Sequence, residues 1–165
     1  MSVIDTLITD RAQLDVDRVK QLAERISTGT ATQAEITEYL TDLKGSYNAS
    51  DLNRVGTACA YLYDLITGYG YTVDNYVPLK TDWAMTDIPT QAQMSDYIQT
   101  VAALKAMWSA AQTIPASMER INYQDANNIE KLLVEVNDII RRVTAAFARS
   151  GAWNAVAGLT IYAMN

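Results

Sequence analysis

The feature that most constrains this chain is a one-sided apolar stripe between Asn122 and Ser150. Its residues recur at alternating steps of three and four, which places them on one face of an α-helix: Ala126, Ile129, Leu133, Val136, Ile140, Val143 and Phe147. Leu132 and Ile139 widen the stripe beyond a coiled-coil seam. The positions assigned to the solvent side are Glu130, Lys131, Glu135, Asn137, Asp138, Arg141 and Arg142. A helix of about 27 residues would be about 40 Å long, which predicts the spine of a small domain.

Two shorter helices are predicted ahead of the middle of the chain. The first begins at Thr9 or Asp10, either of which can cap exposed N–H groups, and ends near Gly29. The second begins at the capping box 32–35, with a hydroxyl at the cap and a carboxylate three residues on, and ends at Gly45.

Two more helices occupy the centre. One is capped by Asn48 or Ser50, carries an apolar stripe at 52, 55, 59, 62 and 66, and stops at the glycines 68 and 70. The other begins at the capping box 90–93 and ends near Gln112. Between them lies an irregular stretch, 71–90, interrupted by two prolines, which Trp83 is expected to hold on the domain. The other connections are short, so neighbouring helices are expected to run antiparallel.

These elements predict an all-α fold, a helical bundle of about five helices with a long 71–90 loop. Residues 1–150 would form one domain. The remaining residues, 151–165, lack helical charge patterning, and their alternating apolar residues predict a short β-strand or extended C-terminal arm. Such an arm needs a surface to pack on, either the domain or a partner. Its candidate partner contacts are Trp153, Leu159, Ile161 and Tyr162.

Composition excludes several kinds of chemistry. The net charge of −6 and the scattered basic residues argue against nucleic-acid binding. No apolar run is long enough to insert in a membrane. The chain has no histidine and one cysteine, Cys59, which is expected to be a small buried hydrophobe. We therefore predict no catalytic residues, no metal site and no cofactor.

One polar cluster stands out as a candidate site: Tyr47, Asn48, Asp51, Asn53 and Arg54, together with Asp82 and Trp83. Arg54 lies beside apolar positions and should need an acidic partner, either Asp82 or Asp51. One interpretation is a structural clamp that fastens the 71–90 loop to the third helix. The other is a recognition surface on which Trp83 stacks against a ligand or partner.

Several stretches of the chain resemble a family of small uncharacterised proteins encoded near tail and fibre genes of phages and prophages that infect gut Firmicutes. The resemblance is carried by segments 7–11 (LITDR), 15–20 (DVDRVK), 43–55 (LKGSYNASDLNRV), 79–83 (LKTDW), 87–90 (DIPT) and 122–133 (NYQDANNIEKLL). Members of that family commonly end in Ser-Gly followed by acidic and aromatic residues. This chain has Ser150-Gly151, but its last residues, 161–165, contain no acidic residue.

The resemblance implies a virion structural protein associated with the tail, fibre or baseplate. Such a protein is not an enzyme and acts by protein–protein contact. Its partners would be other phage structural proteins and further copies of itself, in a homo-oligomer assembled in the host cytoplasm and carried in the virion. Two alternatives remain open: a glycan-binding module for host surface attachment, and an intracellular regulatory or host-directed phage protein.

Overall fold

The computed structural model describes residues 2–41, 43–108 and 110–150, and within them it confirms an all-α helical bundle with no strand. A 3-10 helix, η1, spans Val3–Thr6. The α-helices are α1 (Gln13–Ser27), α2 (Gln33–Tyr39), α3 (Ala49–Gly68), α4 (Gln91–Trp108) and α5 (Tyr123–Ser150). The predicted arm, with Trp153, Leu159, Ile161 and Tyr162, lies outside the described residues.

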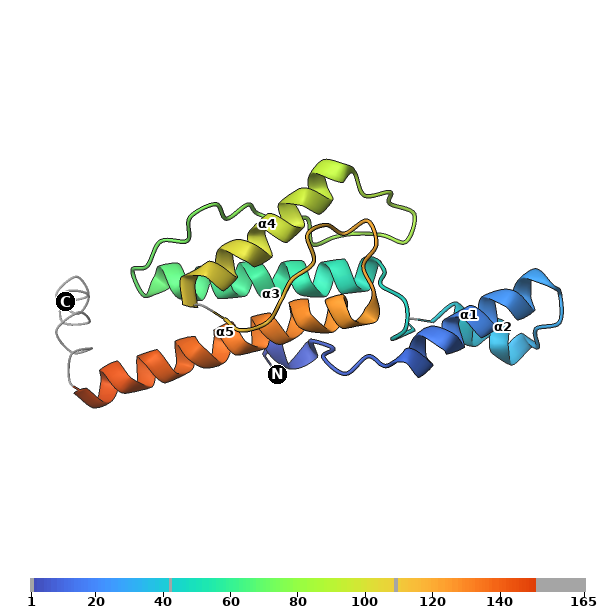
Figure 1. Cartoon of the computed structure of the whole chain (residues 1–165), viewed down its shortest axis with the longest axis horizontal. Coiled ribbons are helices and arrows are strands. Elements are labelled where there is room, and N and C mark those ends of the chain that lie inside the picture. Colours follow the sequence, from blue (N-terminus) through green and yellow to red (C-terminus); the bar gives the residue numbers. More distant parts are fainter. Residues whose placement is uncertain (1, 42, 109, 151–165) are drawn as a thin grey trace, which may run out of the picture.

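Helices α3, α4 and α5 pack on one another and form the body of the molecule (Figure 1). The apolar stripe predicted for α5 lies in the core from Ala126 to Ile140, and its last member, Phe147, reaches solvent. The helix η1 packs against α3 and α5 and buries Ile4. Cys59 is buried in the same core, as predicted.

The three body helices run in the same direction, so the prediction of antiparallel neighbours is wrong for them, whereas α1 and α2 run antiparallel as predicted (Figure 1). Near their starts, the hydroxyl of Tyr47 bonds to that of Tyr97. Near the ends of α3 and α4, the rings of Tyr71 and Trp108 pack edge to face, with their centroids 5.6 Å apart. Parallel helices require a long return between them, and the described segments 69–90 and 110–122 lie in these returns.

Helices α1 and α2 form a hairpin that projects from one end of the body (Figure 1). Two ion pairs join them, Arg18 to Glu38 at 2.5 Å and Arg25 to Glu35 at 3.0 Å. Within the described residues, neither helix packs extensively on α3, α4 or α5.

The predicted helix starts at positions 32, 48, 90 and 122 are confirmed, each with a side chain that accepts a backbone N–H. The first helix starts later than predicted, at Gln13, because side chains of α5 hold the preceding backbone extended. The second ends at Tyr39 rather than Gly45, which instead lies against the backbone of Asp15. The fourth ends at Trp108 rather than Gln112, because the carboxylate of Glu135 accepts the N–H of Ala111.

Candidate functional site

A buried network of charged side chains lies where the N-terminal segment crosses α3 and α5. Arg11, in the extended segment before α1, donates one nitrogen to Asp51 at 2.6 Å and to Glu130 at 2.7 Å. Its other terminal nitrogen donates to the carbonyl of Ile8 at 2.7 Å. Three segments far apart in the sequence therefore meet on one guanidinium group.

Arg54 completes the network from α3. It donates to both oxygens of Glu130, at 3.1 Å and 3.0 Å, and to Asp51. Glu130 is 0% exposed and also accepts the N–H of Ile8 at 2.5 Å. Burial alone would lower the pKa of Arg54, but its hydrogen bonds and the charges of Glu130 and Asp51 outweigh burial and raise it. Two cations thus neutralise two buried carboxylates.

The same region is fixed by two uncharged contacts. Asn127 accepts the N–H of Arg11 at 2.9 Å and donates to its carbonyl at 2.8 Å, as a neighbouring strand would. The guanidinium of Arg11 also lies 5.6 Å from the ring centre of Tyr47. Burial raises the pKa of the hydroxyls of Tyr47 and Tyr97. Both hydroxyls therefore stay protonated, and one donates a hydrogen bond to the other.

The predicted polar cluster separates into two sites. Asp51 and Arg54 join the charged network. Asn48 caps α3, and the ring of Tyr47 lies against the guanidinium of Arg11 in that network. Asn53 instead holds the 71–90 loop: its side chain donates to the carbonyl of Trp83 at 2.9 Å and accepts its N–H at 2.6 Å. Asp51 is a partner of Arg54, as predicted, whereas the alternative partner, Asp82, is exposed and pairs with Lys80 at 2.8 Å.

The loop clamp leaves little of the Trp83 ring for a ligand. Trp83 is 9% exposed and packs in the core, which confirms that it holds the loop on the body. The ammonium of Lys80 lies 5.2 Å from its ring centre, where an outside group would have to stack.

Sequence reasoning missed three residues of the network, Arg11, Asn127 and Glu130, and assigned Glu130 and Asn137 to the solvent side, which is wrong. Positions 126, 130, 133, 137 and 140 also follow alternating steps of four and three, so they share a face. That second stripe was the available signal, together with the need of Arg54 for acidic partners.

The network is suited to holding the chain together and not to reaction. Its carboxylates are inaccessible and already paired with arginines. Across the part of the chain that the structure describes, no group of three or more His, Cys, Asp or Glu side chains is placed to bind a metal ion. The thiol of Cys59 stays protonated because burial raises its pKa to about 12. None of the described helices has the length and apolarity needed to cross a lipid bilayer.

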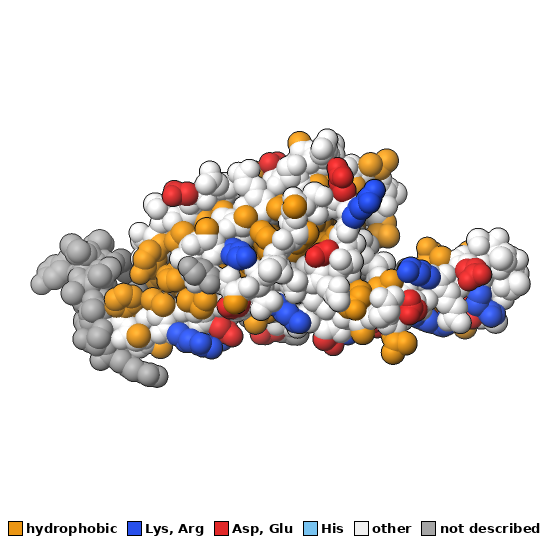
Figure 2. Space-filling view, viewed as in Figure 1, with side chains coloured by type: hydrophobic (Ala, Val, Ile, Leu, Met, Phe, Trp, Pro, Cys, Tyr) orange, Lys and Arg blue, Asp and Glu red, His pale blue; other side chains and the backbone are white. Residues whose placement is uncertain are grey.

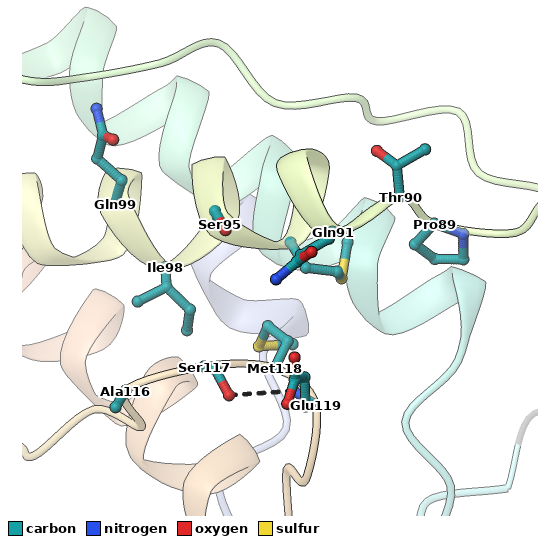
Figure 3. Close-up of a pocket in the computed structure, with 11 residues that line it drawn as sticks. Pro89, Thr90, Gln91, Ser95, Ile98, Gln99, Ala116, Ser117, Met118 and Glu119 are labelled. Atoms are coloured by element: carbon teal, nitrogen blue, oxygen red, sulfur yellow. Dashed lines mark hydrogen bonds between the residues drawn. The ribbon is translucent and has the colours of Figure 1, made fainter.

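Several large apolar side chains are also accessible, among them Leu14, Leu40 and Ile88. Figure 2 shows apolar side chains at the surface of both the body and the hairpin. A groove of about 500 Å³ lies between the first turns of α4 and the segment 116–119. Figure 3 shows Ile98 and Met118 pointing into this groove from its two sides.

Comparison of the chain with protein-family models, with curated proteins and with solved structures found no match.

Proposed function

We propose that this protein is a phage virion structural component, associated with the tail, fibre or baseplate, and that it acts by protein–protein contact. The observation that supports a contact function is the uncovered apolar surface of the α1/α2 hairpin. The resemblance of segments such as 43–55 and 122–133 to tail-associated phage proteins supplies the virion setting.

The hairpin is too small to bury its own apolar side chains. Its helices have 15 and 7 residues, and helices this short depend on tertiary contacts. Among the described residues of the two helices, Leu22 alone is fully buried. Leu14 and Leu40, at the end of the hairpin nearest the body, are 80% and 79% exposed. These two leucines supply apolar area that a partner docking on the hairpin would bury.

The buried charges support recognition over catalysis. An acid–base role needs a carboxylate within reach of a substrate. Asp51 and Glu130 are instead enclosed and each bonded to two arginines. Of the alternatives, glycan binding through Trp83 has no support from the position of that ring.

Mass spectrometry of purified virions and of separated tails tests the setting. We expect the chain to be enriched in the tail fraction. Its absence from virions while it is abundant in infected cells would contradict the proposal and favour the intracellular alternative.

A variant pair tests the surface. Leu14→Gln with Leu40→Gln should reduce incorporation into tails at least tenfold, because both side chains are largely exposed and contribute little to the fold. Glu24→Gln, an exposed change on the same hairpin, should leave incorporation unchanged. Equal incorporation of both variants would exclude the hairpin as the contact surface.

A further inference from the structure

The groove beside α4 is apolar and almost free of charge. Its apolar lining comes from Pro89, Met94, Ile98, Ala116 and Met118. Among the described residues that line it, Glu119 alone is charged. In Figure 3 the polar lining residue Gln99 lies on the α4 side, and Ser117 accepts the N–H of Glu119. Helix α4 itself carries only two charged residues, Asp96 and Lys105. An occupant of this groove should therefore be apolar and uncharged.

The loop that leads into α4 extends the apolar surface outward. Ile88 is 89% exposed and Met85 is 79% exposed, and both precede the groove residue Pro89. Methionine side chains adapt to the shape of a partner, and Met85, Met94 and Met118 border this region. This surface has the composition of a site that binds an apolar partner segment.

The chain supplies an apolar segment without charged residues. Residues 151–165 contain no Lys, Arg, Asp or Glu and carry the apolar side chains Trp153, Leu159, Ile161 and Tyr162. They follow α5, whose last residue, Ser150, lies at the opposite end of the body from the start of α4 (Figure 1).

Distance favours the groove of a neighbouring copy over the chain's own groove. The hydroxyl of Tyr97, the residue before groove residue Ile98, is hydrogen-bonded to that of Tyr47. The ring of Tyr47 lies against Arg11, and the backbone N–H of Arg11 donates to Asn127 of α5. The groove is therefore level with Asn127, about 35 Å along α5 from Ser150. Segment 151–165 reaches at most about 50 Å when fully extended, so a return along α5 would leave only about 15 Å to bind. A neighbour placed end to end would receive the whole segment.

We propose that residues 151–165 of one copy dock in the α4 groove of the next copy. The two surfaces differ, so the contact is heterologous and builds a ring or an open chain of subunits. This inference goes beyond the proposed contact through the hairpin, because it adds a second copy as partner and two further surfaces.

Cross-linking between copies tests the proposal in the full-length chain. Ser95→Cys places a thiol on an exposed position of the groove, and Leu159→Cys places one in the segment. The native Cys59 is buried and should not react. The two single variants are mixed and treated with a short bismaleimide, so that a link between one cysteine of each type requires two copies.

We expect at least tenfold more linked heterodimer than with the control mixture of Asp138→Cys and Leu159→Cys, since Asp138 is exposed on α5 away from the groove. Gln91→Cys, a second exposed groove position, repeats the test if Ser95→Cys disturbs the fold.

Three results would overturn the inference: no link, equal linking at Asp138, or a purely intramolecular link in the chain that carries both Ser95→Cys and Leu159→Cys. The virion measurement is independent of these results. If the chain is found in tails but this cross-link does not form, the proposed function stands and the docking inference is wrong. If the cross-link forms but the chain is absent from virions, the docking inference stands and the proposed function is wrong.

Discussion

The body and the hairpin are both made of helices, but the body buries most of its large apolar side chains, whereas the hairpin fully buries only Leu22 among its described residues. In α3, α4 and α5 the stripes face one another and form one continuous core. Helices α1 and α2 pack chiefly on each other, and Leu14 and Leu40 remain in solvent. A stripe predicts a helix in both regions. Whether that helix is stable depends on how many other surfaces cover the stripe.

The joint between the two regions is polar and tightly packed. Arg11 lies immediately before α1 and is bonded to α3 and α5. Lys44, after α2, pairs with Asp10 at 2.8 Å. The hairpin is thus held at its base by charged contacts, while its apolar residues stay available to a partner.

The largest expected effect is the loss of the buried network. Glu130→Ala removes the partner of two buried arginines, and breaking such a pair costs roughly 3–5 kcal/mol. Urea unfolding followed by circular dichroism should show this loss for the body. Asp138→Ala, an exposed change on the same helix, should shift the midpoint little. A Glu130→Ala protein as stable as the parent would mean that the network does not hold the body together.

The second effect separates the two regions directly. Leu133 and Leu22 are both fully buried, one in the body and one in the hairpin. Leu133→Ala should lower the free energy of unfolding of the whole body by about 2–5 kcal/mol. Leu22→Ala should remove protection from hydrogen exchange in α1 and α2 only. Loss of protection in α3–α5 on Leu22→Ala would show that hairpin and body unfold together.

The third effect concerns the joint. A Cβ at Gly45 would lie 2.0 Å from the backbone oxygen of Asp15, and backbone cannot move aside as a flexible side chain can. Gly45→Ala should therefore displace α1 and cost about 1–3 kcal/mol. Gly68→Ala is the matched control because nothing lies within 4 Å of its Cβ, and it should stabilise α3 by about 0.5–1 kcal/mol. Amide chemical shifts of residues 10–20 would report the displacement.

The smallest effect is the response of the hairpin to acid. Hydrogen bonds from Arg18 hold the pKa of Glu38 below its ordinary value of about 4.5, and a hydrogen bond from the backbone of Thr32 does the same for Glu35. A lowered folded pKa contributes stability above pH 4.5 that is lost as the pH falls through the folded value. Hairpin amide shifts should move toward unfolded values below about pH 4.5. Glu38→Gln should reduce this pH dependence, and an unaltered titration would show that the pair does not stabilise the hairpin.

Much of the fold could be predicted because its signals are local. The caps at Thr32, Asn48, Thr90 and Asn122 were found from residue type and spacing, since each acts on N–H groups within three residues. The α5 stripe located the core for the same reason. The helix ends at Tyr39 and Trp108 could not be predicted, because contacts with distant residues follow both. After Trp108, the carboxylate of Glu135 accepts the N–H of Ala111, and after Tyr39, Gly45 lies against the backbone of Asp15.

The candidate site was predicted only in part. Asp51 and Arg54 were identified because an arginine among apolar positions needs an acid, and Asn53 and Trp83 do hold the loop. Glu130 and Arg11 were missed because their pairing spans 119 positions of sequence. No local rule reports such a contact, although the stripe that Glu130 shares with Ala126 and Leu133 could have shown that it lies on the buried face.

The sequence by itself determined which segments are helical, where most of them begin and which side of α5 is apolar, because helix caps and periodicity depend on neighbours along the chain. The tertiary structure decided that α3, α4 and α5 run in the same direction, that two acids and two arginines are buried together, and that the hairpin is left uncovered. Those outcomes depend on which surfaces meet in space. Contacts between distant segments fix that choice, and spacing along the chain does not record it.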